Sequence, residues 1–177
     1  VAVLDPETFE ELPDGKHGLF ASRGPTGTVY WNKPDQQEKV VRNGWNVFQD
    51  VVWRDEHGDF QYVARHDEMI ISSGYNISPV QVENVLMQHD AVVECACVAA
   101  PDPDGRRGAI VKAYVVVNDR YETDEPLAAD LQYFVKNNAA PYMYPRAISF
   151  EDVLPKTING KILRSELRER ARSEGEE

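Results

Sequence analysis

Cysteines, basic residues and long apolar runs are all scarce in this sequence of 177 residues. Its 19 Lys and Arg residues are outnumbered by 30 Asp and Glu residues, which leaves a formal charge of −11. A nucleic-acid partner is not expected, because phosphates require clusters of lysine and arginine. No run approaches the roughly 18 uninterrupted apolar residues of a membrane-spanning helix, so no membrane span is predicted.

The two cysteines, Cys95 and Cys97, lie two positions apart in an apolar run, so on a strand they would share one face. They are too close to form a disulfide comfortably and are expected to be small buried hydrophobic residues. The four histidines are scattered without the spacing of metal ligands, and no metal site is predicted. A reducing, cytoplasmic location is therefore the expectation.

The pattern of residues changes near position 64. Before it, short apolar runs alternate with turns, and the sequence Gly24-Pro25-Thr26-Gly27 lacks the lysine and helix of a phosphate-binding loop. This first part has strands but no convincing core of its own, as expected of a truncated domain. The patterns predict strands at 1–4, 18–22, 45–53 and 60–63, and a short helix at 36–42.

Beyond position 64 the pattern mixes helices and strands. The run 91–100 is almost continuously apolar, which is typical of a strand covered on both faces. We expect an α+β fold, a small mixed sheet with packed helices. The predicted strands are 91–100, 109–117 and 147–150, and the predicted helices are 79–88, one carrying Leu127 to Val135, and 164–172.

The connection between the two parts is residues 65–79, Arg-His-Asp-Glu-Met-Ile-Ile-Ser-Ser-Gly-Tyr-Asn-Ile-Ser-Pro. Its short apolar strand breaks at Gly74, which permits backbone angles closed to other residues. Ser78 has the character of a helix N-cap, with Pro79 at the first helical position and Gln81 three residues after the cap. Spacing alone predicts a hinge, a hairpin, a glycine loop and a helix start.

Three blocks of this sequence resemble the adenylate-forming enzymes, the superfamily of acyl-CoA synthetases, aryl-CoA ligases, peptide-synthetase adenylation domains and luciferase. The blocks are residues 65–79, Ala-Pro-Tyr-Met-Tyr-Pro-Arg at 140–146 and Leu-Pro-Lys-Thr-Ile-Asn-Gly-Lys at 154–161. Each alone is a weak pattern, but all three occur in the family's order. The resemblance implies that residues 1–64 end a large N-terminal domain and that residues 65–177 are a mobile C-terminal domain.

The resemblance implies roles around a nucleotide for three residues. Lys161 would be the catalytic lysine that bridges the substrate carboxylate and the α-phosphate of ATP. Asp50 would accept hydrogen bonds from both ribose hydroxyls, which suits a carboxylate because it accepts two donors at once. Arg65 would lie near the nucleotide. From the residues alone, Lys161 is a solvated lysine and Asp50 a surface aspartate at a strand end.

The resemblance also implies a hinge and a path for CoA. Asp67 would be the pivot of the small domain, Gly74 and Tyr75 would line the passage of the pantetheine arm, and Lys136 would meet a CoA phosphate. The sequence departs from the family at Gln49, where glycine is usual, and at Asn76, where many relatives carry arginine. A solvated face of a helix is the alternative reading of Lys136.

The implied function is the C-terminal portion of an ATP-dependent acid:CoA ligase, closest to benzoate- or anthranilate-type and medium-chain acyl-CoA ligases. The whole enzyme would use a carboxylic acid, ATP with Mg²⁺, and CoA, and would depend on its own N-terminal domain. This chain alone is expected to be inactive and to hold no tightly bound cofactor. An adenylation domain that loads a carrier protein commonly has Lys-Ile-Arg-Gly where this chain has Ile71-Ser72-Ser73-Gly74. A non-catalytic binding or regulatory module is the other alternative, against which Lys161 and Asp67 argue.

Overall fold

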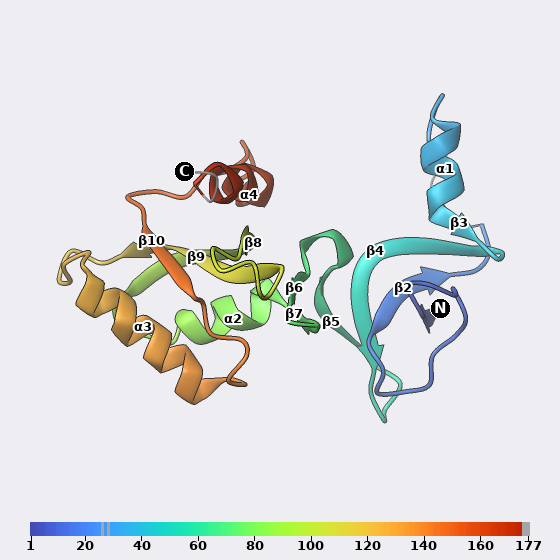
Figure 1. Cartoon of the computed structure of the whole chain (residues 1–177). Coiled ribbons are helices and arrows are strands. Elements are labelled where there is room, and N and C mark those ends of the chain that lie inside the picture. The colour runs from blue at the N-terminus through green and yellow to red at the C-terminus, as the bar shows by residue number, and fades with distance from the viewer. Residues whose placement is uncertain (26, 28, 175–177) are drawn as a thin grey trace. The chain divides into compact units, whose positions relative to one another are not determined.

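The structure is a computed structural model that describes residues 1–25, 27 and 29–174 (Figure 1). Thr26 of the Gly24–Gly27 sequence lies outside the described residues. The chain divides into two compact units, Val1–Asp67 and Glu68–Glu177, and each is described by itself. The division falls close to the change of sequence pattern near residue 64.

The first unit is built on an antiparallel sheet. In its described residues the strand order is β1-β2-β4-β3, and β5 also pairs with β4. The predicted strands are confirmed in type and approximate position. The elements are β1 (Ala2–Leu4), β2 (Gly18–Ser22), α1 (Pro34–Val40), β3 (Val41–Arg42), β4 (Trp45–Arg54) and β5 (Phe60–Arg65). The 3₁₀-helix η1 (His66–Glu68) spans the division between the two units.

The helix predicted at 36–42 was wrong at both ends. Helix α1 begins at Pro34, whose fixed φ suits the first helical turn, and ends at Val40. The next two residues form β3, which pairs with the start of β4. Asn43 and Gly44 between them have φ values of 51° and 76°. Two central residues with positive φ are the requirement of a type I′ hairpin turn, for which Asn-Gly is a preferred sequence.

The first unit also buries more apolar surface than its sequence pattern suggests. The consecutive residues Val51 and Val52 are only 7% and 6% exposed. Consecutive residues of a strand point to opposite faces, so β4 is covered on both faces here. Relative to β2, β4 contains two extra residues between Val47 and Val51, because Leu19 pairs with Val51 and Ala21 with Val47. Extra residues of this kind bend a strand, and β4 is strongly curved in Figure 1.

The second unit contains a mixed sheet and a separate hairpin, as predicted for this part of the chain. In the sheet β8 pairs antiparallel with β9, and β10 pairs parallel with β9. Helix α2 ends two residues earlier than expected. The elements are β6 (Ile70–Ser72), β7 (Tyr75–Ile77), α2 (Pro79–Leu86), β8 (Val92–Pro101), β9 (Ala109–Val117), α3 (Glu125–Asn138), β10 (Ala147–Phe150) and α4 (Arg164–Ser173).

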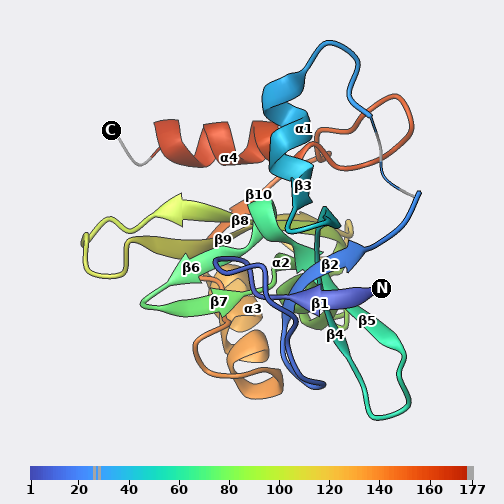
Figure 2. The same cartoon turned by 90° about the vertical axis from the view of Figure 1, so that its right-hand side faces the viewer.

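Both faces of the β8–β9 sheet are covered, as the apolar run 91–100 predicts. One face packs against α2 and α3, with Leu86, Leu131 and both cysteines in that core. The other face packs against α4 through Tyr114 and Leu167. Two views at right angles agree that α4 lies across the sheet from α2 and α3 (Figure 1 and Figure 2). The predicted α+β fold and the burial of Cys95 and Cys97 are confirmed.

Local signals explain where the helices of the second unit begin. Ser78 caps α2 by accepting a hydrogen bond on Oγ from the Gln81 amide at 3.3 Å, as expected for an N-cap. Asp124 caps α3 by accepting a hydrogen bond from the Leu127 amide at 2.9 Å. In the part of the chain that the structure describes, no helix is long and apolar enough to cross a bilayer.

Candidate functional site

Three predicted site residues lie together in the first unit. Asp50 of β4 stands directly opposite Arg65, the last residue of β5, in the antiparallel register. Opposed residues of an antiparallel pair project from the same face of the sheet. Nε of Arg65 donates a hydrogen bond to Oδ1 of Asp67 at 3.0 Å. The nucleotide and hinge candidates of this unit therefore form one charged group at the end of the β4–β5 pair.

The pairing of β4 is irregular around Asp50, which lies between Val47 and Val51, where β4 has two extra residues relative to β2. The β4–β5 register then shifts immediately after the Asp50–Arg65 and Val51–Ala64 pairs, with Val63 as the extra residue of β5. Val51 is buried, whereas Asp50 is half-buried and Arg65 is exposed. Bulges of this kind re-aim side chains and are frequent beside functional sites. Strict alternation of apolar and polar residues cannot reveal such a shift, so sequence reasoning missed it.

In the second unit, Gly74 and Tyr75 belong to the tight hairpin between β6 and β7. Ser73 and Gly74 are its two central residues, with φ of 50° and 82°, the requirement of a type I′ turn. The Ser73 amide donates to the Arg107 carbonyl at 3.1 Å, and Ser72 forms a bridge with Gly108. A Cβ added at Gly74 would meet no atom within 4 Å. Backbone angle, not crowding, therefore favours glycine at this position.

Tyr75 is stacked on Tyr142, a contact that sequence reasoning did not find. The ring centroids are 4.3 Å apart and the planes differ by 10°. Tyr142 lies in the loop between α3 and β10, within the block 140–146. The rings stay 52% and 43% exposed. The only sequence signal was the presence of tyrosine in both blocks, which does not specify a contact.

Lys161 lies in a narrow loop closed by a bridge between Lys156 and Ile162. The Thr157 amide donates to the Lys161 carbonyl at 2.8 Å, and Thr157 Oγ1 accepts from the Lys161 amide at 3.1 Å. Gly160 turns the chain with φ of 79°. The side chain of Ile158 at the tip is completely exposed. The loop thus presents Lys161 on a fixed backbone at the surface.

The two lysines of this loop differ in their partners. Nζ of Lys156 forms an ion pair with Oε1 of Glu94 at 2.9 Å. Within residues 1–25, 27 and 29–174, the ammonium of Lys161 has no hydrogen-bond or ion-pair partner. An exposed ammonium on a loop closed by backbone hydrogen bonds is available to an anionic ligand, whereas Lys156 is already paired with Glu94.

Arg164, three residues after Lys161, ties this loop to the rest of the second unit. Its Nη2 donates to Oε2 of Glu83 at 2.6 Å, and its Nη1 lies 3.8 Å from Oε2 of Glu68. Oε1 of Glu83 accepts a hydrogen bond from the Cys97 amide at 2.7 Å. Burial opposes the charge of Arg164, but the hydrogen bond and charge of Glu83 dominate and raise the pKa of Arg164. Sequence reasoning missed this network.

Lys136 projects from α3 toward an aromatic ring. Its Nζ lies 5.8 Å from the centroid of the Tyr144 ring, and the Arg146 guanidinium carbon lies 4.8 Å from the same centroid. Nη1 of Arg146 also donates to the Tyr144 hydroxyl at 2.8 Å. Lys136 is exposed, and it shares the Tyr144 ring with Arg146.

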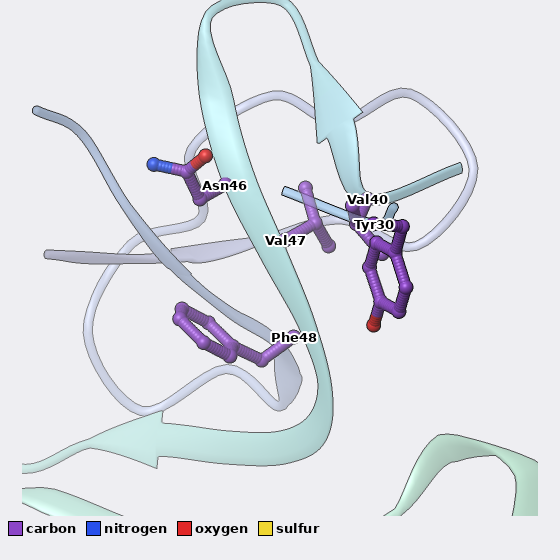
Figure 3. A pocket seen from close by; sticks show the side chains of 5 residues that line it. All are labelled: Tyr30, Val40, Asn46, Val47 and Phe48. Atoms are coloured by element: carbon purple, nitrogen blue, oxygen red, sulfur yellow. The ribbon is translucent and has the colours of Figure 1, made fainter. Parts of the chain in front are cut away.

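A small cavity of about 50 Å³ in the first unit contains none of the predicted site residues. Figure 3 shows the side chains that line it, which come from β4 and from Tyr30 and Val40. This volume is too small for a nucleotide, since small-molecule pockets usually measure about 300–1,000 Å³. The predicted site residues are divided between the two units. Asp50, Arg65 and Asp67 belong to the first unit, and Gly74, Tyr75, Lys136 and Lys161 belong to the second.

Residues 81–161 match the family described as the AMP-binding enzyme C-terminal domain. The match covers most of α2, the β8–β10 sheet, α3 and the loop that ends at Lys161. This part of the chain is similar to that family, and the predicted resemblance to the adenylate-forming enzymes is confirmed.

The chain is also similar to curated proteins over nearly its whole length. It is 42% identical over 177 residues to "Acyl-coenzyme A synthetase ACSM4, mitochondrial" of Mus musculus, which covers 96% of this chain and 30% of that protein. It is 42% identical over 164 residues to "Acyl-coenzyme A synthetase ACSM3, mitochondrial" of Homo sapiens, with 92% and 26% covered. The chain therefore spans less than a third of the length of these relatives.

Solved structures of similar fold include two aryl-CoA ligases. The chain superposes with a TM-score of 0.80 and 38% identity on a benzoate CoA ligase from Burkholderia xenovorans LB400, covering 94% of this chain and 33% of that one. The anthranilate CoA ligase AuaEII in complex with anthranoyl-AMP superposes with a TM-score of 0.86 and 30% identity, covering 99% of this chain and 34% of that one. ATP-bound MatB from Rhodopseudomonas palustris superposes with a TM-score of 0.84 and 30% identity, covering 96% of this chain and 33% of that one.

Proposed function

We propose that this chain is the C-terminal portion of an AMP-forming acid:CoA ligase. The observation that carries the proposal is the 42% identity, over 96% of the chain, to a relative named as an acyl-coenzyme A synthetase. The proposed substrates of the whole enzyme are ATP, CoA and an aryl or medium-chain carboxylic acid. Its N-terminal domain is the proposed partner of this chain, which is supported by the 30% of that relative that the chain spans.

Lys161 is the proposed catalytic residue of the adenylation step. The carboxylate of the acid attacks the α-phosphorus of ATP and pyrophosphate leaves, so two anions must approach each other. One fixed cation at about 4 Å contributes on the order of 4 kcal/mol at an effective dielectric near 20. It speeds the reaction only to the extent that the contact is stronger in the transition state. The exposed ammonium on its closed loop, without a partner among the described residues, supports this role.

Asp50 and Arg65 are proposed to bind the nucleotide. The Asp50 carboxylate would accept hydrogen bonds from the two ribose hydroxyls, and Arg65 would lie beside the nucleotide. Their direct opposition across the β4–β5 pair supports a joint role, since one ligand could reach both side chains. Asp67 is the proposed pivot, and its place as the last residue of the first compact unit supports this.

The CoA thiol is proposed to attack the acyl-adenylate and displace AMP after the small domain has rotated. Gly74 and Tyr75 would line the passage of the pantetheine arm, supported by the open space in front of Gly74. Lys136 would meet a CoA phosphate, supported by its position beside Arg146 on the Tyr144 ring.

Mg²⁺ would accompany the ATP phosphates in the whole enzyme. Among the residues that the structure describes, no three His, Cys, Asp or Glu side chains converge as metal ligands. Magnesium usually takes one or two carboxylates together with substrate phosphates, so no step is derived through it from this chain. The cytoplasmic location stays a prediction, and the relatives are named as mitochondrial proteins.

The experiment that tests this proposal compares two acceptors with the full-length protein. ATP, a panel of aryl and medium-chain acids, and either CoA or a phosphopantetheinyl carrier protein are supplied, and thioester and AMP are measured. We expect acid-dependent thioester with free CoA. Thioester only on the carrier protein would assign the chain to a carrier-loading adenylation domain. No acid-dependent AMP at all would favour the non-catalytic module.

The present chain by itself is expected to be inactive. It carries Lys161 and Asp50, but the acid pocket and the loop that holds the ATP phosphates are proposed to lie in the other part of the enzyme. Pyrophosphate release from ATP with the same acids should stay at background. Acid-dependent release by the purified 177-residue chain would contradict this expectation.

A further inference from the structure

The stacked pair of Tyr75 and Tyr142 joins the glycine hairpin to a distant loop. Tyr75 opposes Ser72, and Ile77 opposes Ile70, on the inward face of the hairpin. Ile70 and Ile77 are buried in the core, while Tyr75 reaches beyond its edge. The Tyr142 ring then covers the Tyr75 ring at a centroid distance of 4.3 Å.

Tyr142 is well placed to hold Tyr75 because its own loop is firmly anchored. The two following residues, Met143 and Tyr144, pack against the core, and Pro145 is buried. The Arg146 amide donates to the Val111 carbonyl at 2.8 Å. A ring carried on such a loop has few alternative positions, so it can limit the rotamers of the ring stacked on it.

The hairpin is thus fixed on two sides, by the β8–β9 turn and by Tyr142. On the first side, Ser73 and Ser72 contact Arg107 and Gly108 through the backbone. Those contacts hold the main chain at the turn but do not restrain the side chain of Tyr75. In the described structure, the stack is the ring contact that restrains the Tyr75 side chain.

We propose that Tyr142 is a positioning residue for the CoA-transfer step. It acts through Tyr75, whose ring it holds as a fixed wall beside Gly74, where the space is open. The inference rests on the proposed function, in which Gly74 and Tyr75 line the passage of the pantetheine arm. A fixed wall reduces the conformations that the flexible arm must lose when its thiol reaches the acyl-adenylate.

The test uses Tyr142→Ala in the full-length enzyme with the two half-reactions assayed separately. We expect kcat/KM for CoA in the transfer step to fall about 2- to 10-fold, the range that the loss of one aromatic pair corresponds to. Adenylation of the acid should remain at the wild-type rate. Tyr142→Phe keeps the ring and should restore transfer. Tyr133→Ala, which removes an exposed tyrosine of α3, is the matched control and should change neither step.

A double variant separates positioning from a direct contact. If Tyr142 acts through Tyr75, adding Tyr142→Ala to Tyr75→Ala should lower transfer no further. Full additivity, equal loss of both half-reactions in Tyr142→Ala, or an unchanged transfer rate would each overturn the proposal. A wild-type enzyme that adenylates the acid but transfers it only to a carrier protein, or not at all, would overturn the proposed function and this inference with it.

The 177-residue chain offers an independent readout that needs no activity. Backbone amide exchange over residues 70–77 should be faster in Tyr142→Ala than in Tyr133→Ala, because the hairpin loses one of its two supports. Equal exchange in the two variants would contradict the positioning role even if the enzyme proves to be a CoA ligase.

Discussion

Lys156 and Lys161 lie five residues apart and differ in whether their ammonium group has an ion-pair partner among the described residues. Lys156 is paired with Glu94 at 2.9 Å at the base of the loop, where about a third of each side chain is exposed. An ion pair with that exposure contributes at most about 1 kcal/mol and is weakened by salt. Lys161 is presented by the same loop with its amide bound to Thr157 and its ammonium directed to no partner in the described structure. The pair therefore provides a site variant and its control.

Lys161→Ala in the full-length enzyme should suppress adenylation and spare CoA transfer. Removing one preorganised charge typically costs about 10²- to 10³-fold in rate. Transfer from supplied acyl-adenylate to CoA should proceed almost normally, because Lys161 is proposed to act only in the adenylating orientation. Lys156→Ala should leave both half-reactions within a few-fold of wild type. Adenylation by Lys161→Ala at a rate close to that of Lys156→Ala would show that Lys161 is an ordinary solvated lysine.

The buried thiols and Tyr114 make stability sensitive to alkaline pH. Burial, reinforced by the charge of Glu83, raises the pKa of Cys95 to about 12 and that of Cys97 well above the ordinary 9.0. Burial likewise raises the pKa of Tyr114 to about 12 from 10.0. The folded protein keeps these protons while the unfolded chain loses them, so stability is complete below about pH 9 and falls as pH rises further.

Urea unfolding at pH 8, 9, 10 and 11 would measure this loss. Each thiol adds at most about 1.4 kcal/mol per pH unit to the slope between its unfolded and folded pKa values. The double variant Cys95→Ala, Cys97→Ala should be less stable at pH 8 but should lose stability more slowly between pH 9 and 10. Parallel slopes for the variant and the wild type would refute the assignment to the thiols.

At the scale of elements, local signals predict most of the fold. The strands β8 and β9 follow from apolar runs, and the start of α2 follows from Ser78 and Pro79, because these effects act within a few residues. The errors are also local. Val41 and Arg42 were expected at the end of a helix but form β3. Asn43 and Gly44 explain the difference, because positive φ at both residues favours a hairpin turn.

Contacts between distant segments could not be predicted in this way. Arg164 meets Glu83, 81 residues earlier in the sequence, and nothing in the neighbouring residues of either specifies the pair. The resemblance to a family identified Lys161 but gave no reason for the geometry of its loop. The Tyr75–Tyr142 stack and the β4–β5 bulge belong to the same class, because long-range packing and register decide them.

The Arg164–Glu83 pair should be important for the stability of the second unit. Arg164→Met leaves the Glu83 carboxylate, whose side chain is only 11% exposed, without its cation. Removing one partner of a buried pair costs about 3–5 kcal/mol, and partial exposure of Arg164 lowers the expectation to about 2–4 kcal/mol. Arg172→Met at the exposed end of the same helix should change stability by about 0.5 kcal/mol or less. Equal midpoints of urea unfolding for the two variants would contradict this.

At the scale of the whole molecule, two neighbouring residues are held by different units. Asp67 is bonded to Arg65 in the first unit at 3.0 Å. Glu68 lies 3.8 Å from Arg164 in the second unit. Asp67 therefore contacts the first unit and Glu68 the second, and the peptide bond between them is where the two compact units divide. A rotation between half-reactions would concentrate its backbone changes at this position.

Asp67→Pro in the full-length enzyme should block the alternation between half-reactions. Proline fixes φ near −65°, so the peptide could not adopt both backbone conformations. We expect adenylate to form and CoA transfer to fail, with both measured separately by acyl-adenylate and thioester formation. Asp67→Ala is the matched control, because it removes the contact with Arg65 but leaves φ free, and it should retain both steps within a few-fold. A folded Asp67→Pro enzyme that loses both steps equally, or neither, would exclude a pivot at this residue.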